Sequence, residues 1–69
     1  MEYKEYVISE FVNDKGQRQA HIRRQDGKHI RVDGASVPVF TTAHADSENE
    51  VVRIAKEAID TKKVSLARD

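Results

Sequence analysis

Apolar and polar side chains alternate along the first half of the chain, as they do in strands that bury one face. Residues 3–12 are rich in aromatic and β-branched side chains, and a turn signal follows at residues 13–16. Ala20 and Ile22 then alternate with polar neighbours, and a second turn signal at Asp26 separates them from another alternating segment. We predict three strands, at about residues 3–12, 18–25 and 28–33.

A further apolar segment at residues 37–41 contains Pro38, which has no N–H group for a strand ladder. A strand in this segment is therefore predicted to be short and to lie at an edge. The expected sheet has three or four strands, depending on whether this segment joins it.

The requirement that apolar side chains share one face decides the register of the second hairpin. A two-residue turn would place Ile22 opposite Arg31, which mixes buried and exposed positions on one face. A three-residue turn at residues 25–27 instead pairs Ile22 with Ile30. On the opposite face this register places four side chains next to one another: His21, Arg23, His29 and Arg31.

The first hairpin has two registers that the pattern leaves open. A three-residue turn at residues 14–16 pairs Ile8 with Ile22, so that Tyr6 and Ile8 face the core. A four-residue turn at residues 13–16 would instead bury Val7 and Phe11. In either register the first strand carries apolar side chains on both faces.

The apolar period changes to three and four residues between Ala45 and Ile59, which predicts an amphipathic helix. Ser47 and Glu50 match the S-x-x-E capping box, which would begin the helix at residue 48. Ala45 already lies on the apolar face, so a start at residue 43 stays open. The helix is predicted to end near residue 61, and residues 64–69 are expected to fray.

Strands followed by one helix predict an α+β fold, with the helix packed on one face of a three- or four-stranded antiparallel meander and residues 1–69 forming one domain. Several short segments carry a resemblance: Tyr3 with Ile8, residues 20–24, Asp26-Gly27, Phe40-Thr41 and residues 58–60. In this order they resemble small bacterial domains of unknown function that consist of an antiparallel sheet followed by one helix. The resemblance implies a fold and a bacterial origin, and it implies no activity and no functional residues.

The composition permits a small core. Val, Ile, Leu and Phe make up about 23 % of the 69 residues, just above the level of about 20 % that is typical of disordered chains. The chain has no cysteine, so neither a disulfide nor a thiolate metal site supplements this core. Self-association is the remaining means of stabilisation. Without cysteine, a basic leader or a long apolar run, we expect a cytoplasmic protein with no membrane partner.

The charges are segregated although the formal net charge is zero. Residues 15–33 carry six basic and two acidic side chains, whereas residues 1–14 and 42–60 are each acidic overall. Local fields rather than totals decide what a surface attracts. The predicted basic hairpin is therefore a candidate surface for an anionic partner.

No motif in the chain indicates catalysis. The three histidines lack the spacing of a helical metal site, no serine lies in a G-x-S-x-G elbow, and the three glycines are too far apart for a phosphate loop. We therefore expect a protein that is not an enzyme and that holds no cofactor and no metal.

Two binding hypotheses remain. The first is a protein-interaction or self-association module, with a homodimer or another protein as partner, because the predicted helix leaves one sheet face uncovered. The second is binding of nucleic acid or another polyanion by the basic face of His21, Arg23, His29 and Arg31. The neutral total charge favours the first hypothesis.

Overall fold

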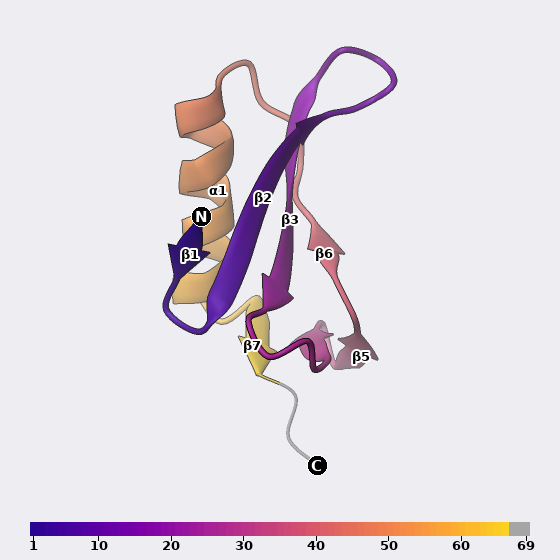
Figure 1. Cartoon of the computed structure of the whole chain (residues 1–69), viewed down its shortest axis with the longest axis vertical. Helices are drawn as coiled ribbons and strands as arrows, with labels where there is room; N and C mark the ends of the chain where they lie inside the picture. Colours follow the sequence, from indigo (N-terminus) through magenta and orange to yellow (C-terminus); the bar gives the residue numbers. More distant parts are fainter. Residues whose placement is uncertain (67–69) are drawn as a thin grey trace.

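The chain forms two small antiparallel sheets and one helix in the computed structural model, which describes residues 1–66 (Figure 1). The elements in chain order are β1 (Glu2–Tyr3), β2 (Tyr6–Val12), β3 (Arg18–Arg24), β4 (Ile30–Val32), β5 (Ala35–Val37), β6 (Phe40–Thr41), α1 (Glu48–Asp60) and β7 (Val64–Leu66). The first sheet has the strand order β1-β2-β3-β6, and the second sheet has the order β5-β4-β7. The predicted α+β class is confirmed.

The hairpin of β2 and β3 has the register that a three-residue turn gives. Ile8 lies opposite Ile22, and the backbone N–H of Gly16 donates to the carbonyl of Asn13 at 3.0 Å. Gly16 has a φ of 76°, which a residue with a side chain rarely adopts. Because Ile8 points to the core, its odd-numbered neighbours on β2 point to the other side of the sheet.

Helix α1 begins at Glu48, which confirms the later of the two predicted starts. The Ser47 hydroxyl accepts the backbone N–H of Glu50 at 3.2 Å, as in a capping box. The helix packs on β2 and β3 through four buried side chains: Val51, Ala55, Ala58 and Ile59. Within residues 1–66 no helix is long and apolar enough to span a bilayer.

The predicted pairing of Ile22 with Ile30 is wrong, because β3 and β4 belong to different sheets. The neighbours of β3 are β2 and β6, and Ile22 lies opposite Phe40 as well as Ile8. At the Asp26 turn the carboxylate accepts the backbone N–H of Lys28 at 3.0 Å, and the chain leaves the first sheet. Alternation identified the residues that face inward but not the strand beside them.

The hairpin that β4 does form turns at Asp33 and Gly34. Their φ values of 51° and 83° are both positive, as a two-residue type I′ turn requires, and Val32 pairs with Ala35 across it. An Asp-Gly pair is a strong hairpin signal, and the sequence contains two of them. The structure uses the second pair to join neighbouring strands.

The segment expected to fray contains a strand. Residues 64–66 form β7, which pairs with β4 so that Val64 lies opposite Val32, and residues 67–69 lie outside the described part of the chain. Val64 is only 1 % exposed, so its burial stabilises this strand. The segment predicted as one strand over residues 37–41 is divided between the end of β5 and β6, with Pro38 between them.

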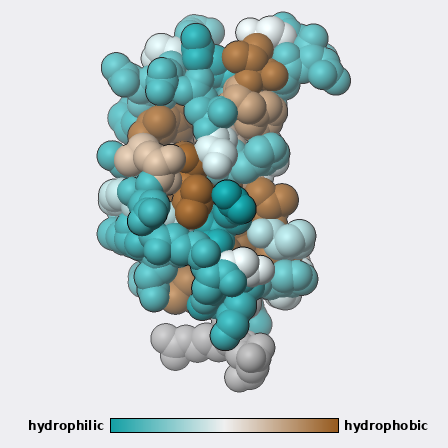
Figure 2. Space-filling model, in the orientation of Figure 1, coloured by the Kyte–Doolittle hydropathy of each residue, from teal (hydrophilic) through white to brown (hydrophobic). Residues whose placement is uncertain are grey.

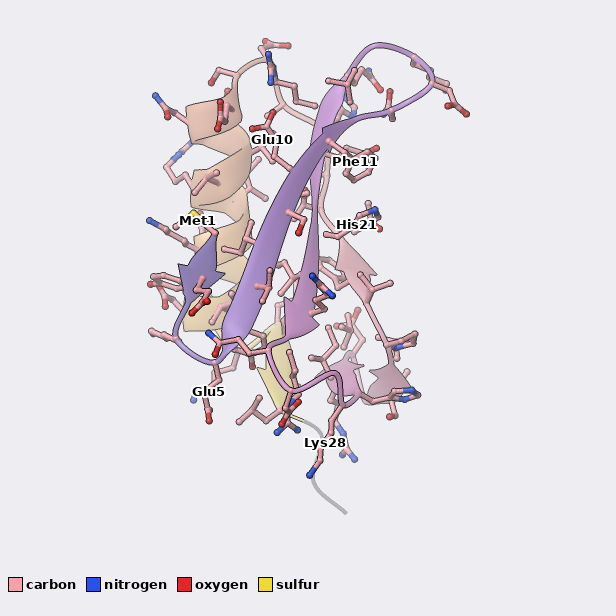
Figure 3. All side chains as sticks on the ribbon, viewed as in Figure 1. Met1, Glu5, Glu10, Phe11, His21 and Lys28 are labelled. Carbon is pink, nitrogen blue, oxygen red and sulfur yellow. The ribbon has the colours of Figure 1, made fainter. Side chains whose placement is uncertain are left out.

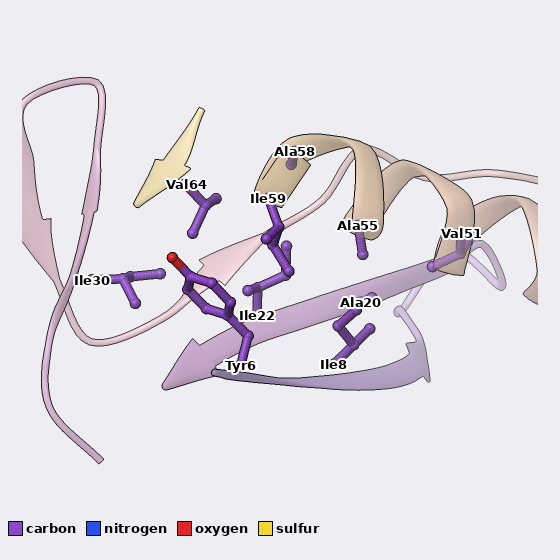
Figure 4. Close-up of a cluster of buried hydrophobic side chains, with 10 residues drawn as sticks. All are labelled: Tyr6, Ile8, Ala20, Ile22, Ile30, Val51, Ala55, Ala58, Ile59 and Val64. Carbon is purple, nitrogen blue, oxygen red and sulfur yellow. The ribbon is translucent and has the colours of Figure 1, made fainter. Parts of the chain in front are cut away.

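One hydrophobic cluster joins both sheets and the helix (Figure 4). Ile22 from the first sheet and Ile30 from the second are both 0 % exposed. The ring of Tyr6 lies between the Ile30 and Ile22 sides of this cluster. Its full membership is Tyr6, Ile8, Ala20, Ile22, Ile30, Val51, Ala55, Ala58, Ile59 and Val64.

Candidate binding surfaces

The first sheet has one face against α1 and one face that no element of residues 1–66 covers (Figure 1). We call the uncovered side the outer face. By strand alternation and register it carries Glu2, Val7, Ser9, Phe11, Gln19, His21, Arg23 and Thr41. Val7 and Phe11 are half-buried there although no helix or strand of residues 1–66 covers this face. The outer face is therefore the first candidate binding surface.

Phe11 and His21 form a stacked pair on this face. Their ring centroids are 4.3 Å apart and their planes are inclined by 11°. Figure 3 shows both rings on the side of the hairpin away from the helix. The His21 imidazole is also held by Thr41, whose Oγ1 lies 3.1 Å from Nδ1. These contacts give the pair a fixed orientation before any partner binds.

A row across the outer face carries opposite charges at its two ends. Glu2 on β1 pairs with Val7 on β2, and Val7 pairs with Arg23 on β3. The Glu2 carboxylate accepts a hydrogen bond from the Gln25 side chain at 3.3 Å. Arg23 is exposed and makes no ion pair within residues 1–66. The row therefore presents a carboxylate, an apolar centre and a guanidinium group.

The structure does not bring the four predicted basic-face residues together. His21 and Arg23 lie on the outer face of the first sheet, whereas Arg31 lies on β4 of the second sheet. His29 precedes β4, and its Nδ1 is 3.2 Å from the Ser36 hydroxyl. The grouping was wrong because it depended on a β3–β4 hairpin that does not form.

Tyr3, Lys4 and Asp60 form a polar cluster that ties the first hairpin to the end of α1. The Tyr3 hydroxyl donates to Asp60 at 2.9 Å, and Lys4 Nζ lies 2.6 Å from the same carboxylate. The Lys4 hydrogen bond, followed by the Tyr3 hydroxyl, lowers the pKa of Asp60. The hydrogen bond to Asp60 in turn raises the pKa of Tyr3. This cluster fastens two elements rather than presenting an open site.

Sequence reasoning missed the place of Glu2 on the outer face. The strand predicted over residues 3–12 is interrupted at Lys4, whose φ of 55° lies in the left-handed region. β1 and β2 are therefore two strands, and Tyr3 pairs with Tyr6 across their turn. Lysine carries no turn signal, so the pattern of apolar residues gave no sign of this break.

No metal site is evident among residues 1–66, since no three His, Asp or Glu side chains converge there. No family model, curated protein or solved structure matches this chain. The resemblance to small bacterial domains of unknown function thus stays a prediction.

Proposed function

We propose that this chain is a self-association module in which two copies pack the outer faces of their first sheets together. The observation that carries the proposal is the row of Glu2, Val7 and Arg23, which has opposite charges at its ends and an apolar centre. An isologous interface needs a surface that is complementary to itself. This row meets that requirement.

The symmetry of such a dimer follows from the strand order. A twofold axis that runs along β2, between the two faces, exchanges the positions of β1 and β3. Glu2 of each copy then lies against Arg23 of the other, and Val7 meets its own counterpart. The same axis brings the two Phe11 rings together, because Phe11 also lies on β2. Two ion pairs thus flank an apolar seam.

The size of the face indicates a weak dimer. Seven residues of β2 span about 23 Å, and four strands are about 19 Å across. Because β1 and β6 have only two residues each, each face covers at most roughly 400 Å². Two such faces bury less than the roughly 1,200 Å² of a standard stable interface. On the side of the molecule that Figure 2 shows, the hydrophobic residues form separate small areas rather than one large patch. Association is therefore expected at high micromolar concentration rather than at nanomolar concentration.

Analytical ultracentrifugation over a wide concentration range tests the proposal. The weight-average mass of the wild-type chain should rise from monomer toward dimer. Arg23→Glu places carboxylates against carboxylates and should abolish the rise. The double variant Glu2→Arg with Arg23→Glu exchanges the charges and should restore association, because each new arginine again faces a new glutamate.

Arg53→Glu provides the matched control, because it makes the same change of charge away from the outer face. Arg53 lies on α1, and its side chain is 71 % exposed. It should associate like the wild type. A monomer mass at every concentration up to the millimolar range would refute the proposal. So would a double variant that stays monomeric while its amide spectrum is that of a folded chain.

A second candidate function, binding of single-stranded nucleic acid, is favoured by the stacked Phe11–His21 pair beside Arg23. Aromatic rings on a sheet offer surfaces on which bases stack, and nearby cations attract phosphates. The separation of Arg31 and His29 from this face and the zero net charge weaken this candidate. Titration of a labelled oligonucleotide at low salt distinguishes the two functions. Binding that weakens with salt and with Phe11→Ala would support the nucleic-acid function.

A further inference from the structure

A cleft of about 510 Å³ opens at the end of the molecule where the β1–β2 turn, the end of α1 and β7 meet. Its volume lies in the range of small-molecule sites. Its lining is divided between an apolar wall that includes Ile59 and Val64 and a polar rim that includes Arg31 and Lys62. The cleft is separate from the outer face, and nothing in the self-association proposal depends on it.

The hydroxyl of Tyr6 is the most informative group in this cleft. Tyr6 is 6 % exposed and lines the cleft, yet its hydroxyl makes no hydrogen bond with the described residues. Tyr6 and Val64 both line the cleft, and Figure 4 shows the hydroxyl oxygen at the Val64 and Ile30 end of the ring.

The polar groups around the cleft are mostly donors. Arg31 and Lys62 are exposed and make no ion pair within residues 1–66, whereas Lys4 is paired with Asp60. Among residues 1–66, Glu5 is the only other carboxylate of the lining. Burial raises the pKa of Tyr6, so its hydroxyl stays protonated and can donate at neutral pH. Two cations that have no ion pair within residues 1–66 and a phenol thus offer hydrogen bonds to an acceptor.

The chemistry of a suitable ligand follows from the apolar wall and the polar rim. Guanidinium, ammonium and phenol groups donate to anionic oxygens, and an Arg side chain can hold a carboxylate or phosphate through two parallel bonds. Side chains such as Ile59 and Val64 prefer an apolar body and offer no hydrogen bond. A bare inorganic ion would use the rim alone, and a neutral apolar molecule would leave the Tyr6 hydroxyl without a partner.

We propose that this cleft binds a small organic anion, whose carboxylate or phosphate oxygens accept from Arg31 and Tyr6 and whose apolar part rests on Ile59 and Val64. Lys62 adds a second positive charge at the mouth of the cleft. The shared chemistry is an anionic head on a ring or a short chain.

Amide NMR titration of the full chain with four probes tests the proposal. Phenyl phosphate and benzoate combine a ring with phosphate or carboxylate, phenol has the ring alone, and inorganic phosphate has the charge alone. The two ring anions should shift the resonances of residues around Tyr6, Arg31 and Ser65. A dissociation constant in the millimolar range is expected for ligands of about ten non-hydrogen atoms. Phenol and inorganic phosphate should each bind about tenfold more weakly.

Two variants report on the two polar contacts. Arg31→Gln should weaken phenyl phosphate about tenfold, as loss of a charged hydrogen bond does. Tyr6→Phe should weaken it several-fold without loss of stability, because the hydroxyl has no partner to lose within residues 1–66. Arg53→Gln makes the same change at an exposed position of α1 away from the cleft, and it should bind phenyl phosphate like the wild type.

Several outcomes of these titrations would contradict the proposed anion site. Equal affinity for phenol and phenyl phosphate would mean that no anion is recognised, and equal affinity for inorganic phosphate would remove the apolar half of the proposal. Unchanged binding by Arg31→Gln, or shifts centred on His21 and Arg23, would place the ligand elsewhere. Arg31 is exposed on β4, so Arg31→Gln is expected to fold. This variant therefore tests the proposal even if Tyr6→Phe fails to fold.

Discussion

The hydroxyl of Thr42 accepts the backbone N–H of Ala20 at 3.0 Å and donates to the carbonyl of Ala43 at 3.0 Å. The backbone N–H of Thr42 donates in turn to the carbonyl of Ala20 at 2.9 Å. Thr42 is the one buried polar residue in the described part of the chain, at 2 % exposure. It therefore connects the segment after β6 to the centre of β3, where Ala20 is fully buried.

Thr42→Val should destabilise the fold more than its small change in shape suggests. The substitution leaves the N–H of Ala20 without a partner in the core, which costs about 1–3 kcal/mol. Thr41→Val is the matched control, because Thr41 is exposed and water can replace its contact with His21. Urea denaturation measures both. Equal free energies of unfolding for the two variants would contradict the role given to Thr42.

Ile22→Ala and Ile30→Ala should each cost about 2–5 kcal/mol, because each removes buried methyl and methylene groups and leaves a cavity. Both side chains are 0 % exposed, although they belong to different sheets. Arg23→Ala, on the outer face, should change stability little when it is measured at a concentration where the chain is monomeric. If Ile30→Ala unfolded at the same urea concentration as Arg23→Ala, the second sheet would not share the core.

Asp60 should make the fold sensitive to acid. Its pKa is lowered from 3.8 in the folded chain, mainly by the hydrogen bond from Lys4 and then by that from Tyr3. A lowered folded-state pKa means that the contribution of Asp60 is present above pH 3.8 and is lost as the pH falls toward the folded-state value. Thermal melts across this range should show a shallower acid dependence for Asp60→Asn. Asp46→Asn, which breaks no ion pair of the described residues, should keep the wild-type slope.

Val64→Ala tests whether β7 belongs to the fold. Val64 is 1 % exposed and packs in the core, so its truncation should cost about 2 kcal/mol. Ser65→Ala, one residue along the same strand, should cost much less because Ser65 is half-exposed. Calorimetry compares the two melting temperatures. Equal melting temperatures for Val64→Ala and the wild type would mean that residues 64–66 do not contribute to the fold.

The sequence carries the helix and the first hairpin in local signals. Ser47 and Glu50 match the capping-box spacing and indicated one of the two predicted helix starts, and a three-residue turn gave one of the two predicted registers, in which Ile8 pairs with Ile22. Both signals depend on residues that are close in sequence or joined by one short turn. Each left one alternative open, a helix start at residue 43 and a four-residue turn at residues 13–16, and the structure decides between them.

The partners of β4 could not be obtained in this way. Alternation shows that Ile30 faces inward, but it does not say which strand lies beside it. The strands beside β4 are β5, which begins at Ala35 after a turn of two residues, and β7, which begins at Val64 far along the chain. The predicted basic face was wrong because it required β4 to pair with β3. His21 and Arg23 do share one face, because both lie on β3, whose register with β2 is one of the two that the sequence left open.

The pairing of β4 with β7 has a consequence for the order of folding. Arg31 and Ser65 face each other across 34 positions of sequence, and the intervening chain contains β5, β6 and the whole of α1. Closing so long a loop is entropically unfavourable and tends to be slow, so this contact is expected to form late, after the local hairpins and the helix. During synthesis, Ile30 would have only the β5 side of its sheet until residue 66 emerges.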